Sequence, residues 1–202
     1  ITVPQPRDWN VVVKGAATER GTMKRVSQAR MLSDGFVYND QGATVRLDSA
    51  KADAIAEFVE GLGEPVVVVA RWRESISHLA LKLADHRPAV VASESSDVAW
   101  QLARFRSGET KVLIISARYG EGIDGLQDVA RVLVFCSNGS ANDRKQMIGR
   151  LYRHGQSRGC VVYDVVSEGS MDQRQLDLIS SQTDLAESQI DKILAAEFGL
   201  EG

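Results

Sequence analysis

Two arginines, Arg150 and Arg153, stand three residues apart near the end of a helix predicted over residues 141–152. Residues with this spacing lie on one face of a helix. A guanidinium group keeps its charge near neutral pH, and its planar fork of N–H donors matches the oxygens of a phosphate. The pair could therefore neutralise the charge that develops on a phosphoryl group during its transfer. The structural alternative is that these cations serve only the dipole at a helix C-terminus.

A glycine-rich loop, Ser116–Gly125, follows a strand predicted over residues 111–116. Ligands of open α/β sheets bind beyond the carboxyl ends of the strands, where this loop must lie. Its glycines permit a close approach of the backbone, and Asp124 could accept a hydrogen bond from a ribose hydroxyl. The alternative is an ordinary connector whose aspartate caps a turn.

The elements that must position these residues alternate between strand and helix. Apolar runs predict strands at 66–70, 89–92, 111–116, 131–135 and 160–166, and helical spacing of apolar residues predicts helices between them and from Met171 to Phe198. Each connection is long enough for a right-handed crossover between parallel strands. The predicted fold class is therefore α/β, a parallel sheet covered by helices on both faces.

The first 47 residues are predicted to be an irregular extension. Within it, Trp9–Val13 is typical of a short strand, Thr22–Leu32 of a basic helix, and Phe36–Leu47 of a hairpin that turns near Asn39–Gly42. The basic helix carries Lys24, Arg25 and Arg30. These cations are expected either to follow a phosphate backbone or to form a solvated face.

Composition excludes several classes. The chain has 202 residues, 44% of them apolar and 25% charged, as in ordinary globular proteins. Its net charge of -3 gives no bulk signal of nucleic-acid binding. The longest apolar runs are strand-sized, so we expect no membrane span, and no cysteine–histidine cluster indicates a metal site. Cys136 and Cys160 stand in apolar runs, typical of reduced thiols in a cytoplasmic protein.

In their order, these segments resemble the motifs of superfamily 2 helicases. The spacing of Gln146, Gly149, Arg150 and Arg153 resembles motif VI, and the ending Arg153-His154-Gly155-Gln156 is similar to that of Swi/Snf-type ATPases. Residues 116–124 look like motif V, with a Gly-Ile-Asp ending closer to the DEAD-box form. Pro65–Ala70 is similar to motif IV, and residues 36–51 to the lead-in of the second lobe of Swi/Snf-like proteins. The resemblance covers about residues 30–180.

The resemblance implies a RecA-like parallel sheet, the C-terminal lobe of a P-loop NTPase helicase, over residues 48–180, with a helical tail at 181–202. By resemblance, Arg153 is the arginine finger and Arg150 a second γ-phosphate contact. Gly122, Asp124 and Gln146 would lie at the nucleotide cleft.

The same resemblance implies a grip on nucleic acid. Ser116, at the position of the motif V threonine, would contact a backbone phosphate. Ser93 and Arg71, which follow other predicted strands, would do the same. Trp72 and Trp100 could stack on bases, although a packing role is favoured for Trp100 because aromatic side chains are usually buried.

The motifs of a first motor lobe are missing from this sequence. The stretch nearest to a P-loop, Gly15–Thr22, has one residue too many and lacks the lysine, and no Asp-Glu dipeptide occurs. ATP and Mg²⁺ would therefore be held mainly by an N-terminal RecA-like lobe of the same protein. The first residue, Ile1, suggests an excised fragment, which alone would be inactive.

The sequence thus predicts the C-terminal motor lobe of an ATP-dependent helicase or translocase. The ending Arg-x-Gly-Gln favours DNA over RNA, because it is similar to Swi/Snf-type enzymes that act on duplex DNA. The alternatives are a non-catalytic nucleic-acid-binding module of the same fold, the lobe of an RNA helicase, and an unrelated doubly wound enzyme that binds a phosphorylated metabolite.

Overall fold

A computed structural model of the chain describes residues 1–4, 19–39, 41–47, 50–92, 97–119, 123–137, 140–181 and 187–199. It divides into two compact units. The first comprises Ile1 and Ala52–Val165, and the second comprises Thr2–Lys51 and Val166–Gly202. The predicted strand Trp9–Val13 lies outside the described residues.

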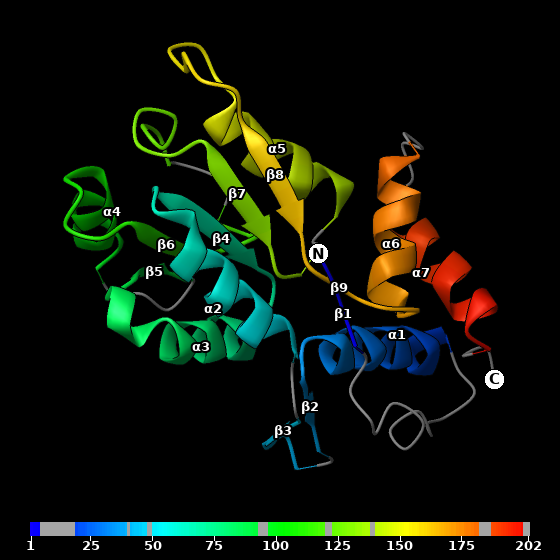
Figure 1. The fold of residues 1–202 in the computed structure, drawn as a ribbon. Helices are drawn as coiled ribbons and strands as arrows, with labels where there is room; N and C mark the ends of the chain where they lie inside the picture. The colour runs from blue at the N-terminus through cyan, green and yellow to red at the C-terminus, as the bar shows by residue number, and fades with distance from the viewer. Residues whose placement is uncertain are drawn as a thin grey trace. The chain divides into compact units, whose positions relative to one another are not determined.

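The first unit is built on a five-stranded parallel sheet in the order β5-β6-β4-β7-β8 (Figure 1). The strands are β4 (Val66–Ala70), β5 (Ala89–Val91), β6 (Val112–Ser116), β7 (Val132–Phe135) and β8 (Val161–Asp164). Strand β4 pairs with β6 on one side and with β7 on the other, and every residue of these three strands is buried. Such continuous apolar strands are typical of a sheet covered on both faces. The predicted α/β class is confirmed.

Four helices belong to the sheet: α2 (Ala50–Leu62), α3 (Arg73–Lys82), α4 (Val98–Arg106) and α5 (Ala141–Leu151). A short 3₁₀ turn, η1 (Ala84–His86), follows α3. Gly63, at φ +67°, ends α2 in the left-handed conformation that glycine adopts most easily. Helix α5 begins with a capping box, in which the Asp143 amide donates to Ser140 Oγ at 3.1 Å and the Ser140 amide donates to an Asp143 carboxylate oxygen at 3.0 Å. The helix predicted over residues 141–152 begins at the same residue as α5 and ends one residue later.

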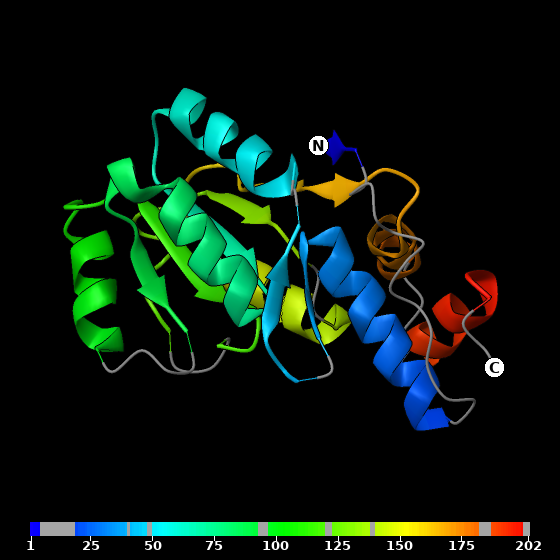
Figure 2. The same ribbon diagram turned by 90° about the horizontal axis from the view of Figure 1, so that it is seen from below.

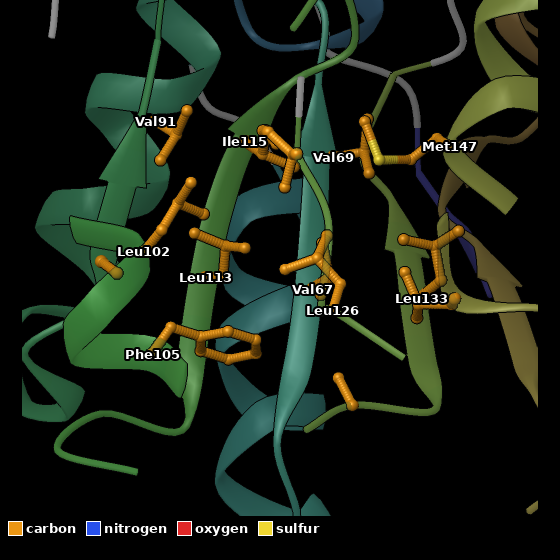
Figure 3. Close-up of a cluster of buried hydrophobic side chains, with 14 of the residues drawn as sticks. Val67, Val69, Val91, Leu102, Phe105, Leu113, Ile115, Leu126, Leu133 and Met147 are labelled. Atoms are coloured by element: carbon orange, nitrogen blue, oxygen red, sulfur yellow. The ribbon is translucent and has the colours of Figure 1, made fainter. Parts of the chain in front are cut away.

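One face of the sheet forms the core that anchors α4 and α5 (Figure 3). Leu102 and Phe105 of α4 and Met147 of α5 pack there, together with Leu126 from the segment between β6 and β7. Burying one such side chain contributes about 1.5–3 kcal/mol. This packing fixes the backbone of α5 and of the segment around Leu126. It therefore also fixes the positions of the exposed residues next to them.

The predicted strand 160–166 is two strands in the structure. Strand β8 ends at Asp164, and Val166–Ser167 forms β9, which pairs in parallel with β1 (Thr2–Val3). Between them, the Val165 amide makes the last bond toward β7, to the Phe135 carbonyl at 3.0 Å. Valines on both sides of Asp164 let the sequence be taken for one strand, which hides this change of partner.

The second unit contains the helices α1 (Glu19–Ser33), α6 (Met171–Ser180) and α7 (Glu187–Glu197) and the hairpin of β2 (Phe36–Tyr38) with β3 (Thr44–Arg46). Figure 2 gives a second view of these elements. The predicted basic helix and hairpin are confirmed. The expectation of an irregular extension at 1–47 and a separate tail at 181–202 differs from the structure, because α1, α6 and α7 share one apolar core of Val26, Ala29, Met171, Ile190, Leu194 and Ala195. The limits of 48–180 for the helicase lobe stay a prediction.

The basic residues of α1 differ from both expectations. Lys24 is exposed, but Arg25 and Arg30 are only 9% and 5% exposed. Both arginines are therefore parts of the interior of the second unit and not of a solvated or phosphate-tracking face.

A buried ion cluster joins three segments of the second unit. Lys51 Nζ lies 2.9 Å from Asp34 Oδ1 and also contacts the carboxylate of Asp172, and the three side chains are at most 5% exposed. Burial raises the pKa of Asp172, against the opposing effects of Lys51 and Arg30. The predicted cap of α2 at Asp48 or Ser49 lies outside the described residues.

Among the described residues, no helix is both long enough and apolar enough to cross a membrane.

Candidate functional site

The end of α5 presents the predicted arginines to solvent. Met147 and Leu151 are buried in the core and Ile148 packs against it, whereas Gly149 is exposed and Arg150 is partly exposed. Arg150 lies in the last turn, and the helix ends at Tyr152, whose φ of −87° and ψ of 78° are not helical. Arg153 therefore follows the helix end, beside Arg150.

Asp124 brings the two arginines together. Arg150 Nη1 donates to the Asp124 carboxylate at 3.3 Å and to the Ile123 carbonyl at 2.9 Å. Arg153 Nη1 donates to the same carboxylate oxygen, Oδ1 of Asp124. The segment that resembles motif V and the helix that resembles motif VI thus meet at one anion. The structure unites three of the five residues predicted for catalysis and nucleotide binding.

Two hollows border this meeting point. One, of about 250 Å³, is lined by Gln146, Gly149, Arg150 and Arg153. The other, of about 470 Å³, is lined by Arg118, Tyr119, Asn142, Asp143 and Gln146. Gln146 is exposed and lines both hollows, and its place at the nucleotide cleft stays a prediction. Gly122 lies outside the described residues.

The ion pairs at this point are exposed. The side chains of Arg150, Arg153 and Asp124 are 22%, 49% and 71% exposed. Exposed pairs contribute only about 0–1 kcal/mol to stability, because water screens the charges. A phosphate that carries more charge than a carboxylate can therefore compete for both guanidinium groups.

Sequence reasoning missed Arg106 at this place. Its Nη2 atom donates to the main-chain carbonyl of Asp124. Arg106 lies at the end of α4, 18 residues before its partner, and nothing in its neighbourhood in the sequence indicates the contact. It holds the main chain of the aspartate whose side chain holds the two arginines.

Gln156, the last residue of the Arg-x-Gly-Gln ending, has a structural role. Its side-chain amide donates to the carbonyls of Gln127 at 2.8 Å and Ala130 at 3.1 Å, and its Oε1 accepts from the Arg158 amide at 3.1 Å. The residue ties the turn after α5 to the segment that leads into β7, and so supports the position of Arg153.

Arg144, also on α5, is a structural arginine. It makes two hydrogen bonds to Asp164, at 2.5 and 2.8 Å, and its guanidinium lies 4.4 Å from the centre of the Phe135 ring. Its side chain is 14% exposed, compared with 49% for Arg153. Arg150, at 22%, is only slightly more exposed than Arg144, so the partner, Asp164 or Asp124, distinguishes the two arginines of this helix.

The residues predicted for nucleic-acid contact share one edge of the sheet. Ser116 ends β6, opposite Ala70 of β4, and Arg71 follows that strand. Ser116 is 7% exposed, and its hydroxyl accepts from the Arg118 amide at 3.4 Å. The Arg71 amide donates to Ser137 Oγ at 2.8 Å. Their contacts with nucleic acid stay predictions, and Ser93 lies outside the described residues.

In the described part of the chain, no three histidine, cysteine or carboxylate side chains are grouped as a ligand set for a metal.

Comparison with known proteins places the chain. Residues 50–155 match the family described as helicase conserved C-terminal domain. No curated protein sequence matches the chain.

Two solved structures have a similar fold. The C-terminal part of the Fun30 ATPase domain is 16% identical, with a TM-score of 0.62 over 73% of this chain and 52% of that one. The Hef helicase domain of Pyrococcus furiosus is 22% identical, with a TM-score of 0.52 over 68% of this chain and 29% of that one. The chain thus spans about half of the first protein and less than a third of the second. It belongs to the helicase conserved C-terminal domain family and has the fold of the second, RecA-like lobe of a superfamily 2 helicase.

Proposed function

We propose that this lobe supplies Arg153 as the arginine finger, and Arg150 as a second contact, to the γ-phosphate of ATP bound by the first lobe of the same protein. The observation that carries the proposal is that Arg150 and Arg153 both reach one oxygen of Asp124. A single anion can therefore engage both guanidinium groups. In our proposal the carboxylate stands where a phosphate oxygen arrives when the lobes close.

The donors at this place suit phosphate. Charge in phosphoryl transfer spreads over the equatorial oxygens of the transferred group, and an arginine that meets them contributes about 10³–10⁵ in rate. Gln146 lines both hollows and would orient this segment at the cleft between the lobes. Gly122 and Asp124 would line the nucleotide cleft near the ribose and the phosphates. Mg²⁺ prefers carboxylate, phosphate and water oxygens, and the Asp124 carboxylate at this place is already engaged by both arginines. We assign Mg²⁺ to the first lobe.

The parent enzyme would couple ATP hydrolysis to movement along nucleic acid. Arg71, Ser93 and Ser116 follow neighbouring strands, and this edge would contact the phosphate backbone. The likeness of Arg153-His154-Gly155-Gln156 to Swi/Snf-type ATPases supports DNA as the substrate. Closure of the two lobes on ATP would change the distance between the positions at which they hold the nucleic-acid strand.

The half-site nature of this lobe can be tested with the purified chain and with a protein that contains both lobes. The chain alone should not hydrolyse ATP, and the two-lobed protein should do so faster when nucleic acid is present. If the chain alone hydrolyses ATP, and its turnover per mole of protein stays constant through successive purification columns, the proposal is overturned. A two-lobed protein that binds nucleic acid without any turnover would favour the non-catalytic module.

A further inference from the structure

Trp100 is an exposed indole on a helix whose other side is buried. Leu102 and Phe105 carry the packing of α4 against the sheet, and they are 5% and 0% exposed. The sequence favours a partly buried packing role for Trp100, and in the structure its side chain is 52% exposed. An indole left in water forgoes a large apolar burial, which makes this side chain available to a partner.

Arg104, one helical turn after Trp100, backs the ring. Its guanidinium carbon lies 4.8 Å from the ring centre, within the range of a cation–π interaction. Only 11% of the Arg104 side chain is exposed. A cation–π pair on a helix surface is ordinarily mobile, but this arginine is held in place.

Three hydrogen bonds fix the Arg104 guanidinium. They lead to Glu109 Oε1 at 2.7 Å, to the Arg87 carbonyl at 3.0 Å and to Gln101 Oε1 at 3.2 Å. Gln101 Oε1 also accepts from the Val90 amide of β5 at 3.2 Å. The support of the ring is therefore tied to the edge strand of the sheet. The indole is a preorganised surface rather than a loose side chain.

The position of Trp100 suits a contact at the side of the sheet where the carboxyl ends of the strands lie. Helix α4 follows β5 and packs beside it at the end of the sheet (Figure 1). Trp100 lies in the first turn, and helical side chains lean toward the N-terminus of their helix. Because α4 is the next helix after β5 in a parallel sheet, its first turn is expected near the carboxyl ends of the strands, where Ser116 ends β6 and Arg71 follows β4.

We propose that Trp100, backed by Arg104, is a stacking platform for an unpaired base of single-stranded nucleic acid. The proposal rests on the proposed nucleic-acid grip of this lobe, and it favours a single strand over the duplex on which Swi/Snf-type enzymes act. Every base has a π-face that an indole can stack on, whereas the bases of a duplex cover one another. Arg104 is already paired with Glu109, and Arg106 is bonded to the Asp124 carbonyl, so the platform contributes through the face of the indole rather than through phosphate contacts of α4.

A fluorescence titration tests the platform directly. A chain with Trp9→Phe and Trp72→Phe keeps Trp100 as its one tryptophan. A short oligothymidylate should quench its emission in a saturable way, and a duplex of the same length should quench it less. The reason is that stacking places the base against the indole.

Affinity measured by anisotropy gives a second readout. Stacking contributes about 1–3 kcal/mol per base, and a factor of ten corresponds to ~1.4 kcal/mol, so Trp100→Ala should weaken single-strand binding by about 5- to 150-fold. Trp100→Phe should restore most of the loss. The matched control is Leu81→Ala, which removes another exposed apolar side chain of the same unit and should change nothing. The salt dependence of binding should be unaltered in Trp100→Ala, because no phosphate contact is removed.

The outcomes separate the two claims. Binding by Trp100→Ala within about twofold of wild type, with no quenching in the single-tryptophan chain, would overturn the platform and leave the nucleic-acid grip standing; it would point to a protein partner for this surface. A wild-type chain that binds neither the single strand nor the duplex would overturn the grip as well.

Discussion

Arg153 donates a hydrogen bond to Oδ1 of Asp124, which lies 29 residues earlier in the chain. The same oxygen accepts from Arg150 at 3.3 Å. The lobe thus supplies its own anion to the two arginines that we assign to the γ-phosphate. Because the cluster is exposed, this anion is replaceable. When a nucleotide binds, its phosphate must replace the Asp124 carboxylate as the partner of these two arginines.

Asp124→Asn tests this exchange. The substitution keeps the oxygen but removes the charge, so the isolated chain should bind tripolyphosphate about two- to fivefold more tightly, the factor that ~0.4–1 kcal/mol of exposed charge interaction produces. Calorimetric titration measures the affinity, and Asp85→Asn, another exposed carboxylate of the same unit, controls for net charge. Weaker binding in Asp124→Asn alone would show that the side chain assists the phosphate instead of competing with it.

Gln156→Ala should act on stability rather than on chemistry. The substitution leaves the carbonyls of Gln127 and Ala130 without this donor, and an unsatisfied buried polar group costs about 1–3 kcal/mol. Urea unfolding should show that loss in the chain, while His154→Ala, at an exposed position of the same turn, should show almost none. Unchanged stability together with lost turnover in the two-lobed protein would place Gln156 on the nucleotide instead.

The buried ion cluster makes Lys51 a sensitive position. Lys51→Met leaves Asp34 and Asp172 buried without their shared cation, and breaking a buried pair in this way costs about 3–5 kcal/mol. The control is Lys82→Met, which removes the exposed pair with Asp53 and should cost less than ~1 kcal/mol. Similar losses in the two variants, measured by urea unfolding, would show that the cluster carries little stability.

Asp172 predicts how stability depends on pH. Burial raises its pKa above the ordinary value of 3.8, so the folded state holds the proton more tightly than the unfolded state. Its contribution is complete below 3.8 and is lost as the pH rises through the raised value. Asp172→Asn imitates the protonated form and should remove this slope from unfolding curves taken across that window. A variant with the wild-type slope would assign the titration to another group.

The sheet and most helices could be predicted from the sequence, because their signals are local. The run Val66–Ala70 is apolar throughout, and Gly63 and Pro65 mark the end of the preceding helix. The change of partner between β8 and β9 could not be predicted, since Val165 and Val166 are equally apolar on either side of it. The shared core of α1 and α7 escaped for a related reason: a short helix does not reveal its partner when that partner is more than 150 residues away.

The residues of the candidate site also fall into those that the sequence could predict and those that it could not. Arg150, Arg153 and Asp124 could be identified because spacing and order carry the resemblance. The contact of Arg106 with Asp124 and the support of Trp100 by Arg104 depend on side-chain positions that only the packing of α4 decides. Ser116 shows how far a resemblance between motifs can predict a role. It lies at the end of a strand, as predicted, but its side chain is buried.

The most direct measurement is the ATP turnover of a two-lobed protein with Arg153→Ala. Turnover should fall by about 10³-fold or more, or ~4 kcal/mol of transition-state stabilisation. ATP affinity should stay near wild type, because the first lobe makes most contacts with bound ATP. The melting temperature should also stay near wild type, because Arg153 is half exposed and its partner Asp124 is more exposed still. Arg153→Lys should restore little, since an ammonium group lacks the planar fork, and Arg158→Ala, at an exposed position of the same turn region, should leave turnover unchanged. Turnover of Arg153→Ala within about threefold of wild type, a loss below ~1 kcal/mol, would contradict the account.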